Sequence, residues 1–266
     1  MSRKIILLFF VFVFTFCFYA SDQKEERAEK ILHSCIKKAL SGSGDKREAI
    51  KECTKAIELN PKHPEAYEYR GLAKMDLKDF KGAIQDFTKA VELLPKYEST
   101  YTTIAYGTRR VDPYYTRQYA LAYFHRADAK KYLKDYKGAI QDYTKAMEIW
   151  PDLESDVYLN IGLIKESLKD YGDAIQYFTN SIKVKFDKFE AYLRRGVVKE
   201  RLKDYKGAIQ DYNKAIIFYP EYAIAYYYRG LCKIFLGDKK GGCLDLSKAG
   251  ELGYSGAYDK FKDFCQ

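Results

Sequence analysis

The chain has 266 residues, with 46 Lys plus Arg against 37 Asp plus Glu and 47% hydrophobic residues. That hydrophobic content is enough to bury a core and excludes a disordered polymer, and six prolines and 17 glycines exclude collagen-like and proline-rich chains. The formal charge is +9, but the basic residues alternate with acids and do not form a cluster. The absence of a basic cluster argues against nucleic-acid binding.

Residues 1–20 have the pattern of a secretory signal peptide. Two basic residues precede an apolar run over residues 5–19, which is shorter than the ~20 residues of a bilayer-spanning helix, and the small residue Ala20 follows. Phe18 fits the cleavage motif poorly, because a small residue normally stands two positions before the cleavage site. We therefore expect an exported protein, periplasmic or secreted, with an uncleaved membrane anchor over residues 5–19 as the alternative.

A nine-residue motif recurs six times in the rest of the chain. It begins with aspartate and centres on a small residue, found at Ala49, Ala83, Ala139, Ala174, Ala208 and Gly242. The spacing is 34 or 35 residues except for one step of 56, which indicates an insertion. A fixed period of this length is typical of a repeat solenoid. We expect a solenoid over residues 21–266 with repeats at about 30–63, 64–97, 120–153, 155–188, 189–222 and 223–256, and an insertion over 98–119.

Each repeat is predicted to form two helices. In the second repeat, apolar and small residues fall at helical spacing over residues 65–77 and again over 81–93. Pro95 then predicts the end of the second helix, because proline cannot continue the hydrogen-bond ladder. Three other repeats have a proline at the same place, whereas the fourth has Phe186, for which we expect a less sharply defined end.

The repeats resemble the tetratricopeptide repeat. The family pattern runs aromatic, Leu-Gly, Tyr, Ala-x3-Phe and Pro, and the second repeat has Tyr67, Gly71, Ala83, Phe87 and a proline at these places. The resemblance implies an all-α, right-handed superhelical solenoid of about six helix-turn-helix repeats. The amphipathic pattern of the last segment predicts a C-terminal capping helix at 255–266. In this family the first helix of each repeat lines a concave groove that binds a peptide or protein segment.

Four repeats depart from the family pattern in the same way. Each has arginine where the family has leucine, and each has aspartate sixteen residues later. Because the two positions face each other in an antiparallel hairpin, we predict four partly buried ion pairs: Arg70–Asp86, Arg126–Asp142, Arg195–Asp211 and Arg229–Asp245. The fourth repeat lacks both residues and has Ile161 and Tyr177 instead.

Five cysteines follow residue 20. Export would favour disulfides, and Cys35 with Cys53 and Cys232 with Cys243 fall on facing helices of one hairpin each. We predict these two bridges, with Cys265 left unpaired. Four reduced, buried thiols are the alternative.

Carried over from the family, the groove lining comprises Tyr69, Phe124, His125, Asp128, Asn160, Arg194, Tyr227 and Tyr228. This aromatic and polar mixture suits a peptide with apolar anchors. The insertion over 98–119 is rich in Tyr and Arg, residue types common in interfaces. It is predicted to be either a second contact surface or a spacer.

The sequence contains no recognisable catalytic or cofactor motif. The three histidines lie far apart, and neither a glycine-rich phosphate loop nor a nucleophile elbow is present. We expect a non-enzymatic scaffold or adaptor that binds a protein or peptide, with no cofactor, metal or nucleic acid. The alternatives are a membrane-anchored assembly scaffold and a glycan- or small-ligand-binding protein.

Overall fold

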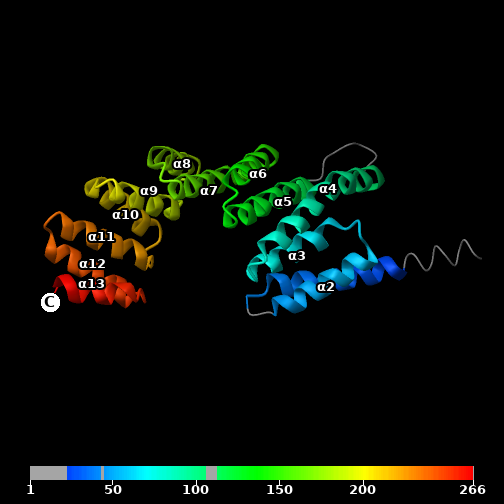
Figure 1. Ribbon diagram of the computed structural model, residues 1–266, viewed down its shortest axis with the longest axis horizontal. Coiled ribbons are helices and arrows are strands. Elements are labelled where there is room, and N and C mark those ends of the chain that lie inside the picture. Colours follow the sequence, from blue (N-terminus) through cyan, green and yellow to red (C-terminus); the bar gives the residue numbers. More distant parts are fainter. Residues whose placement is uncertain (1–22, 43–44, 106–112, 266) are drawn as a thin grey trace, which may run out of the picture. The chain divides into compact units, whose positions relative to one another are not determined.

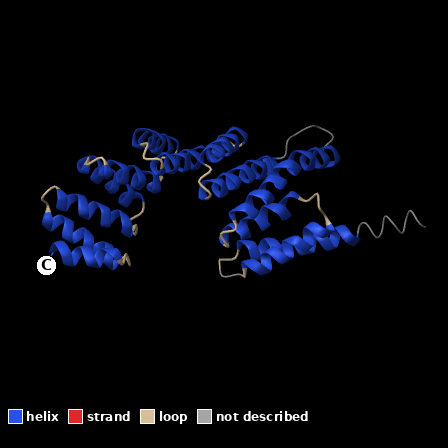
Figure 2. Cartoon of the chain, viewed as in Figure 1, coloured by secondary structure: helices blue, strands red, loops and turns tan. Residues whose placement is uncertain are grey.

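A computed structural model describes residues 23–42, 45–105 and 113–265. Over these residues the chain is helical and contains no strand (Figure 2). The predicted signal peptide or anchor over residues 1–20 lies outside the described residues.

Thirteen successive helical segments and one short 3-10 turn follow each other among the described residues. They are a helix over residues 23–40, α2 (Lys46–Leu59), α3 (Pro64–Asp76), α4 (Phe80–Ala105), α5 (Pro113–Tyr132), α6 (Tyr136–Ile149), η1 (Pro151–Leu153), α7 (Glu154–Ser167), α8 (Tyr171–Val184), α9 (Phe189–Arg201), α10 (Tyr205–Phe218), α11 (Ala223–Phe235), α12 (Lys239–Glu251) and α13 (Gly256–Cys265).

The chain divides into two compact units, unit 1 over Met1–Trp150 and unit 2 over Pro151–Gln266 (Figure 1). Within each unit, consecutive helices pair as hairpins, for example α3 with α4 and α9 with α10. The second helix of one hairpin packs on the first helix of the next, as α10 does on α11, and α13 packs on α12. This arrangement is an all-α repeat solenoid.

The helix ends differ from the sequence prediction at two places. The prediction that Pro95 ends its helix is wrong, because α4 continues to Ala105. Proline removes one N–H donor, but its fixed φ is helical, and the ladder resumes after it. The less sharply defined helix end expected near Phe186 is also not observed. α8 ends at Val184, and its C-cap residue Lys185 has the same backbone geometry as Tyr219 after α10.

Most of the predicted insertion extends the helices on either side of it. Residues 98–105 belong to α4, and residues 113–119 form the first two turns of α5. α5 begins at Pro113, a residue type favoured in the first turn of a helix. Residues 106–112 lie outside the described residues.

The two helices of a hairpin approach closely at a glycine. A Cβ atom added to Gly196 on α9 would lie 2.6 Å from Cε1 of Tyr212 on α10, and one added to Gly71 would lie 2.7 Å from Cε1 of Phe87. Both aromatic rings are fully buried. The small residues of the repeat pattern therefore leave room for the ring that fills each hairpin.

The turn inside each hairpin has a left-handed residue. Lys78, Lys134, Lys169 and Lys203 have φ between 62° and 64°, and Gly237 has φ 92° at the same place in the last repeat. The backbone N–H groups that follow the first helix return to its last carbonyls, as Asp204 N–H does to Lys199 O at 2.9 Å. This is a Schellman-type cap, in which only glycine adopts the left-handed conformation without steric cost.

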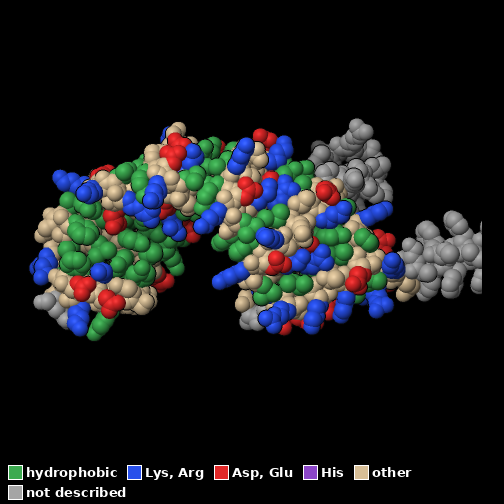
Figure 3. Space-filling view, viewed as in Figure 1, with side chains coloured by type: hydrophobic (Ala, Val, Ile, Leu, Met, Phe, Trp, Pro, Cys, Tyr) green, Lys and Arg blue, Asp and Glu red, His purple; other side chains and the backbone are tan. Residues whose placement is uncertain are grey.

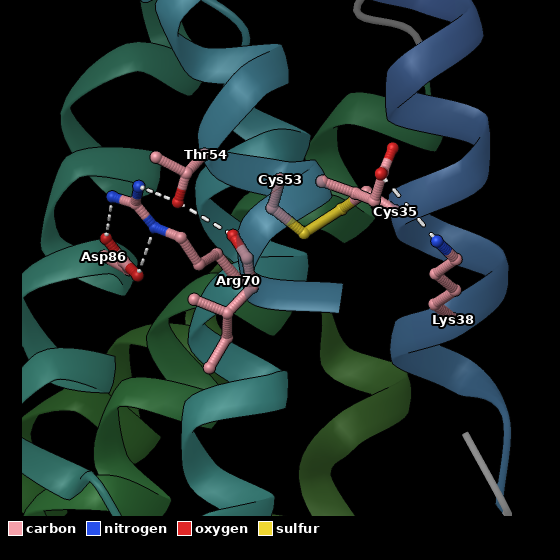
Figure 4. The surroundings of a disulfide bond; sticks show 8 residues. Cys35, Lys38, Cys53, Thr54, Arg70 and Asp86 are labelled. Atoms are coloured by element: carbon pink, nitrogen blue, oxygen red, sulfur yellow. Dashed lines mark hydrogen bonds and ion pairs between the residues drawn. A yellow bond between two sulfur atoms is a disulfide. The ribbon is translucent and has the colours of Figure 1, made fainter. Parts of the chain in front are cut away.

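Each predicted Arg–Asp position holds a buried, bidentate ion pair (Figure 4). Arg70 donates from Nε to Asp86 Oδ2 at 3.0 Å and from Nη2 to Oδ1 at 2.7 Å, and the Asp86 side chain is only 5% exposed. The pairs at Arg126, Arg195 and Arg229 have the same two bonds. Forked pairing of this kind is the strongest geometry for an arginine and a carboxylate.

Two further partners of these pairs were not predicted. Lysine four residues after the arginine donates to the same carboxylate, as Lys74 Nζ does to Asp86 Oδ2 at 2.7 Å. The free arginine nitrogen reaches back to the preceding repeat, where Arg70 Nη1 donates to Thr54 Oγ1 at 3.1 Å. In the other three pairs the lysines are Lys130, Lys199 and Lys233, and the acceptors are Thr88, Thr179 and Asn213. The arginines thus join successive repeats as well as the two helices of one hairpin.

The fourth repeat, which has Ile161 in place of arginine, uses other contacts. Ser155 and Ser181 are both buried and exchange hydrogen bonds between α7 and α8. Its lysine at the corresponding place, Lys165, turns outward to Asp170 and Asp173. This repeat begins unit 2, so the arginine series is interrupted at the first hairpin of that unit.

The described residues include two disulfides, and only one of them was predicted. Cys35 is bonded to Cys53 across the first hairpin (Figure 4). The predicted Cys232–Cys243 bridge is wrong, as is the prediction that Cys265 is left over, because Cys243 is bonded to Cys265 on α13. Cys232 is a buried free thiol on α11, and its pKa is raised to about 12 by burial and by the nearby Glu200 carboxylate. Cys243 on α12 faces α13 and not Cys232. The repeat pattern does not predict where α13 packs, so it could not predict this pairing.

Replacing a left-handed lysine by glycine should stabilise the chain. Lys203→Gly removes the Cβ clash at a positive φ, and we expect the free energy of unfolding to rise by about 1 kcal/mol. Gly237→Ala should lower it by a similar amount. Urea unfolding followed by circular dichroism measures both, and shifts of the same sign in the two variants would contradict this account.

Removing one partner of a buried ion pair should be costly. Asp211→Asn leaves Arg195 and Lys199 without a carboxylate, and we expect a loss of ~3–5 kcal/mol in the free energy of unfolding. A double-mutant cycle with Arg195→Met should then show strong coupling. The exposed pair Lys248–Glu251 is the control, with expected coupling of ~0–1 kcal/mol. Equal coupling in the two cycles would contradict a stabilising role for the buried network.

Peptide mapping under non-reducing conditions tests the disulfides. We expect Cys35 linked to Cys53 and Cys243 linked to Cys265, with Cys232 alkylated only after denaturation because it is buried in the fold. A peptide that links Cys232 to Cys243 would overturn the observed pairing.

Candidate functional site

Within each unit the first helices of successive repeats touch one another. In unit 2, α9 contacts both α7 and α11, and in unit 1, α3 contacts α5. Each unit therefore has a continuous surface made of first helices, which we call its first-helix surface. The predicted groove residues are divided between these two surfaces, four on each.

The first-helix surface of unit 2 carries a cluster of tyrosines. The Tyr227 ring lies 5.2 Å from Tyr228 and 4.8 Å from Tyr254, which follows α12, and Tyr228 stacks 6.0 Å from the buried Tyr212. Tyr227 and Tyr228 are half-buried. The cluster thus offers partly exposed rings that are already held in place by their neighbours.

The charges around these tyrosines have opposite signs. Burial raises the pKa of Tyr228, and the nearby Tyr254 and Glu200 raise it further, whereas Arg194 lowers it. For Tyr227, burial again raises the pKa and Lys260 opposes the shift. Arg194 is exposed on α9 and forms no salt bridge among the described residues. It is the cation of this cluster that remains available to a partner.

Hydrophobic side chains also gather over the α10–α12 part of unit 2 (Figure 3). At the ends of α8 and α10, Phe186 is 72% exposed and contacts Phe218, while Phe189 contacts Tyr219 and Tyr222. In the sequence, Phe186 stands out only as an aromatic residue at a place where four other repeats have proline. Its exposure becomes evident only in the folded chain.

The first-helix surface of unit 1 is more polar and its residues contact one another. His125 on α5 packs near Phe87 and Phe124, and its Nδ1 lies 3.6 Å from Oε1 of Glu68 on α3. Glu68 is only 3% exposed. Tyr69 packs against the clusters around Cys35 and Ala39, so its ring belongs to the contact between the first two repeats.

Two acids on first helices accept hydrogen bonds from buried tyrosines. Asp128 accepts from the Tyr143 hydroxyl at 2.6 Å and from Lys131 at 2.8 Å, and Glu200 accepts from Tyr212 at 2.9 Å. Burial and the adjacent acid raise the pKa of both tyrosines, and burial raises that of Glu200. The equivalent rings of the second and fourth repeats are phenylalanines, which need no acceptor. Asp128 therefore satisfies a core hydroxyl group.

One insertion residue contacts the first helix of the preceding repeat, because Tyr114 on α5 donates to Glu65 on α3 at 2.6 Å. Another, Tyr119, contacts its own helix, with its hydroxyl oxygen 3.4 Å from that of Tyr123. Burial raises the pKa of Tyr119 to about 12. Asn160, the one predicted groove residue not yet described, donates from its side chain to the backbone carbonyl of Asp156 on its own helix.

Among the described residues, no group of His, Cys, Asp and Glu side chains has an arrangement that could hold a metal ion. The described helices also include none with the length and hydropathy of a bilayer span.

Several solved structures share this fold. The chain is similar to YrrB, a TPR protein with an unusual peptide-binding site, with TM-score 0.51 and 19% identity over 79% of this chain and 97% of that one. It is similar to pilF of Pseudomonas aeruginosa with TM-score 0.63 and 16% identity over 92% and 99% of the two chains. It also matches a chain of the Cut9–Hcn1 complex of APC/C with TM-score 0.65 and 15% identity over 94% of this chain and 45% of that one. At these identities the similarity shows the fold alone.

No curated protein matches the sequence. Models described as tetratricopeptide repeat match residues 38–98, 120–152 and 159–223, which together make up more than half of the chain. The chain belongs to the tetratricopeptide repeat family.

Proposed function

We propose that the chain is a non-enzymatic scaffold that binds a peptide or protein segment on the first-helix surface of unit 2. The observation that carries this proposal is the tyrosine cluster of Tyr227, Tyr228 and Tyr254 beside the exposed Arg194. Tyrosine and arginine contribute strongly to binding because they combine a large apolar area with polar groups. The peptide-binding site of YrrB, which shares the fold, is in keeping with this role.

The rigidity of the surface supports the same role. Arg195 and Arg229 tie α9 and α11 to their hairpins and to the preceding repeats, so the backbone beneath Arg194 and Tyr227 is fixed before a partner arrives. A surface that is ordered in advance loses less conformational entropy on binding. The mechanism that we propose is therefore presentation of a preformed surface, without chemistry and without a cofactor.

We further propose that the protein works in an oxidising compartment outside the cytoplasm. The two disulfides favour such a compartment, because cytosolic proteins rarely keep structural disulfides. The signal-like pattern of residues 1–20 fits the same location. Whether residues 5–19 are cleaved or remain as an anchor is read directly from the intact mass of the protein isolated from cells.

Site-specific photocrosslinking tests the binding surface. A benzophenone amino acid in place of Glu190, which is exposed one turn before Arg194 on α9, should give a discrete adduct with a partner in an envelope extract. This position leaves Arg194 and the tyrosine cluster in place. The same probe in place of Lys214, an exposed residue on the second helix α10, is the matched control and should give none.

Tyr227→Ala should reduce the adduct at position 190 without changing the circular dichroism spectrum, since the ring is half-buried and its removal leaves the arginine network intact. Adducts that form at position 214 and not at 190 would assign the partner to the second helices. Adducts at both positions that are unchanged by Tyr227→Ala would contradict a specific site.

A further inference from the structure

The last hairpin departs from the repeat pattern of the chain at three positions. Where four of the other repeats have the aromatic residues Phe80, Tyr136, Tyr171 and Tyr205, this hairpin has Lys239. Where the other five repeats have isoleucine, it has Cys243. Where they have an exposed glutamine or lysine, it has Leu244, which is 65% exposed. A single exposed leucine is ordinary on a protein surface, so the meaning of Leu244 depends on the residues around it.

All three departures line one cavity. A groove of about 550 Å³ lies beside α12 and α13, and it is lined by Lys239, Lys240, Leu244, Ser247, Phe261 and the Cys243–Cys265 disulfide. Sites for small ligands commonly enclose ~300–1,000 Å³ and are mainly apolar with a few charged groups. The volume and the mainly apolar lining of this α12–α13 groove fall within that description, and the groove is widely open to solvent.

The groove has an apolar body and a cationic rim. Leu244, Phe261 and the disulfide supply the apolar lining, while Lys239 and Lys240 are adjacent and exposed at the start of α12. No acidic side chain lines the groove, and neither lysine has a salt bridge among the described residues. The nearest acid in sequence, Asp238, accepts the backbone N–H of Gly241 at 2.8 Å as the helix cap.

We propose that the α12–α13 groove binds a single-chain anionic amphiphile, a molecule with one hydrocarbon chain and a carboxylate or phosphate at one end. The chain packs on Leu244, Phe261 and the disulfide, and the anion pairs with Lys239 and Lys240. The disulfide holds α13 against α12, so it also keeps the groove formed. The residues that line this groove differ from those of the tyrosine cluster, and the binding site does not depend on the proposed scaffold function.

Calorimetric titration of the full chain with dodecanoate, below the concentration at which it forms micelles, tests the proposal. We expect saturable binding of one molecule at this site. Lys239→Glu/Lys240→Glu should weaken it by about tenfold or more, because two attractions become repulsions. The same charge change at the preceding turn, Lys203→Glu/Lys206→Glu, is the matched control and should have no effect.

Leu244→Gln is the sharper variant, because it installs the residue found at this place in four other repeats and should fold normally. We expect it to weaken dodecanoate binding by about fivefold, the loss of roughly one apolar side-chain contact. Cys265→Ser should weaken binding as well, while the Cys35–Cys53 bridge remains intact.

The charge and the source of the ligand are tested by three further probes. Dodecyl phosphate should bind like dodecanoate, and dodecyltrimethylammonium, which has the same chain and the opposite charge, should bind much more weakly. Phosphatidylglycerol vesicles distinguish a free amphiphile from a membrane surface. Equal binding of the cation, affinity unchanged by Leu244→Gln and by the lysine reversals, or binding to vesicles without binding of dodecanoate would each overturn the proposal.

Discussion

Four hairpins of the solenoid each bury an aspartate that requires the arginine beside it. A carboxylate such as Asp86, with a side chain only 5% exposed, would destabilise the hairpin if its charge were not matched. The structure supplies two cations to each aspartate, an arginine in bidentate contact and a lysine one helical turn later. Because the arginine also donates to a hydroxyl or amide of the preceding repeat, the same guanidinium fixes both the hairpin and the stacking of hairpins. Its ring neighbour, for example Tyr192 beside Arg195, completes the contact through a cation–π interaction.

This network explains why the first-helix surfaces can be both aromatic and well ordered. The side chains proposed to face a partner, Arg194 and Tyr227, stand one and two positions before the buried arginines Arg195 and Arg229. Because successive residues of a helix point in directions about 100° apart, one face of the helix is held by ion pairs while an adjacent face is left for contact. The tyrosine hydroxyls that would be buried without a partner, at positions 143 and 212, are satisfied by Asp128 and Glu200.

A disulfide reinforces the first hairpin of the repeat array, and another reinforces the last. Terminal repeats have a neighbour on one side only, so they bury less apolar surface than internal repeats. Cys35–Cys53 joins the helices of the first hairpin, and Cys243–Cys265 fastens α13 to the last one. At the last hairpin this bond also lines the α12–α13 groove, where the repeat pattern is abandoned at three positions. A cap that is needed for stability thus also forms a surface with its own chemistry.

The sequence by itself determined the repeats, their two-helix hairpins and the Arg–Asp pairing, because these follow from periodicity and from facing positions within one hairpin. It did not determine features that require knowledge of what lies next to a hairpin. The second disulfide, the link from Arg70 to Thr54 and the acceptors of Tyr143 and Tyr212 depend on which face of a helix meets its neighbour. The end of α4 is a similar case, since a local rule placed it at Pro95 and the helix in fact continues to Ala105. Local patterns fix the elements, whereas contacts between residues far apart in the sequence exist only after the helices have packed.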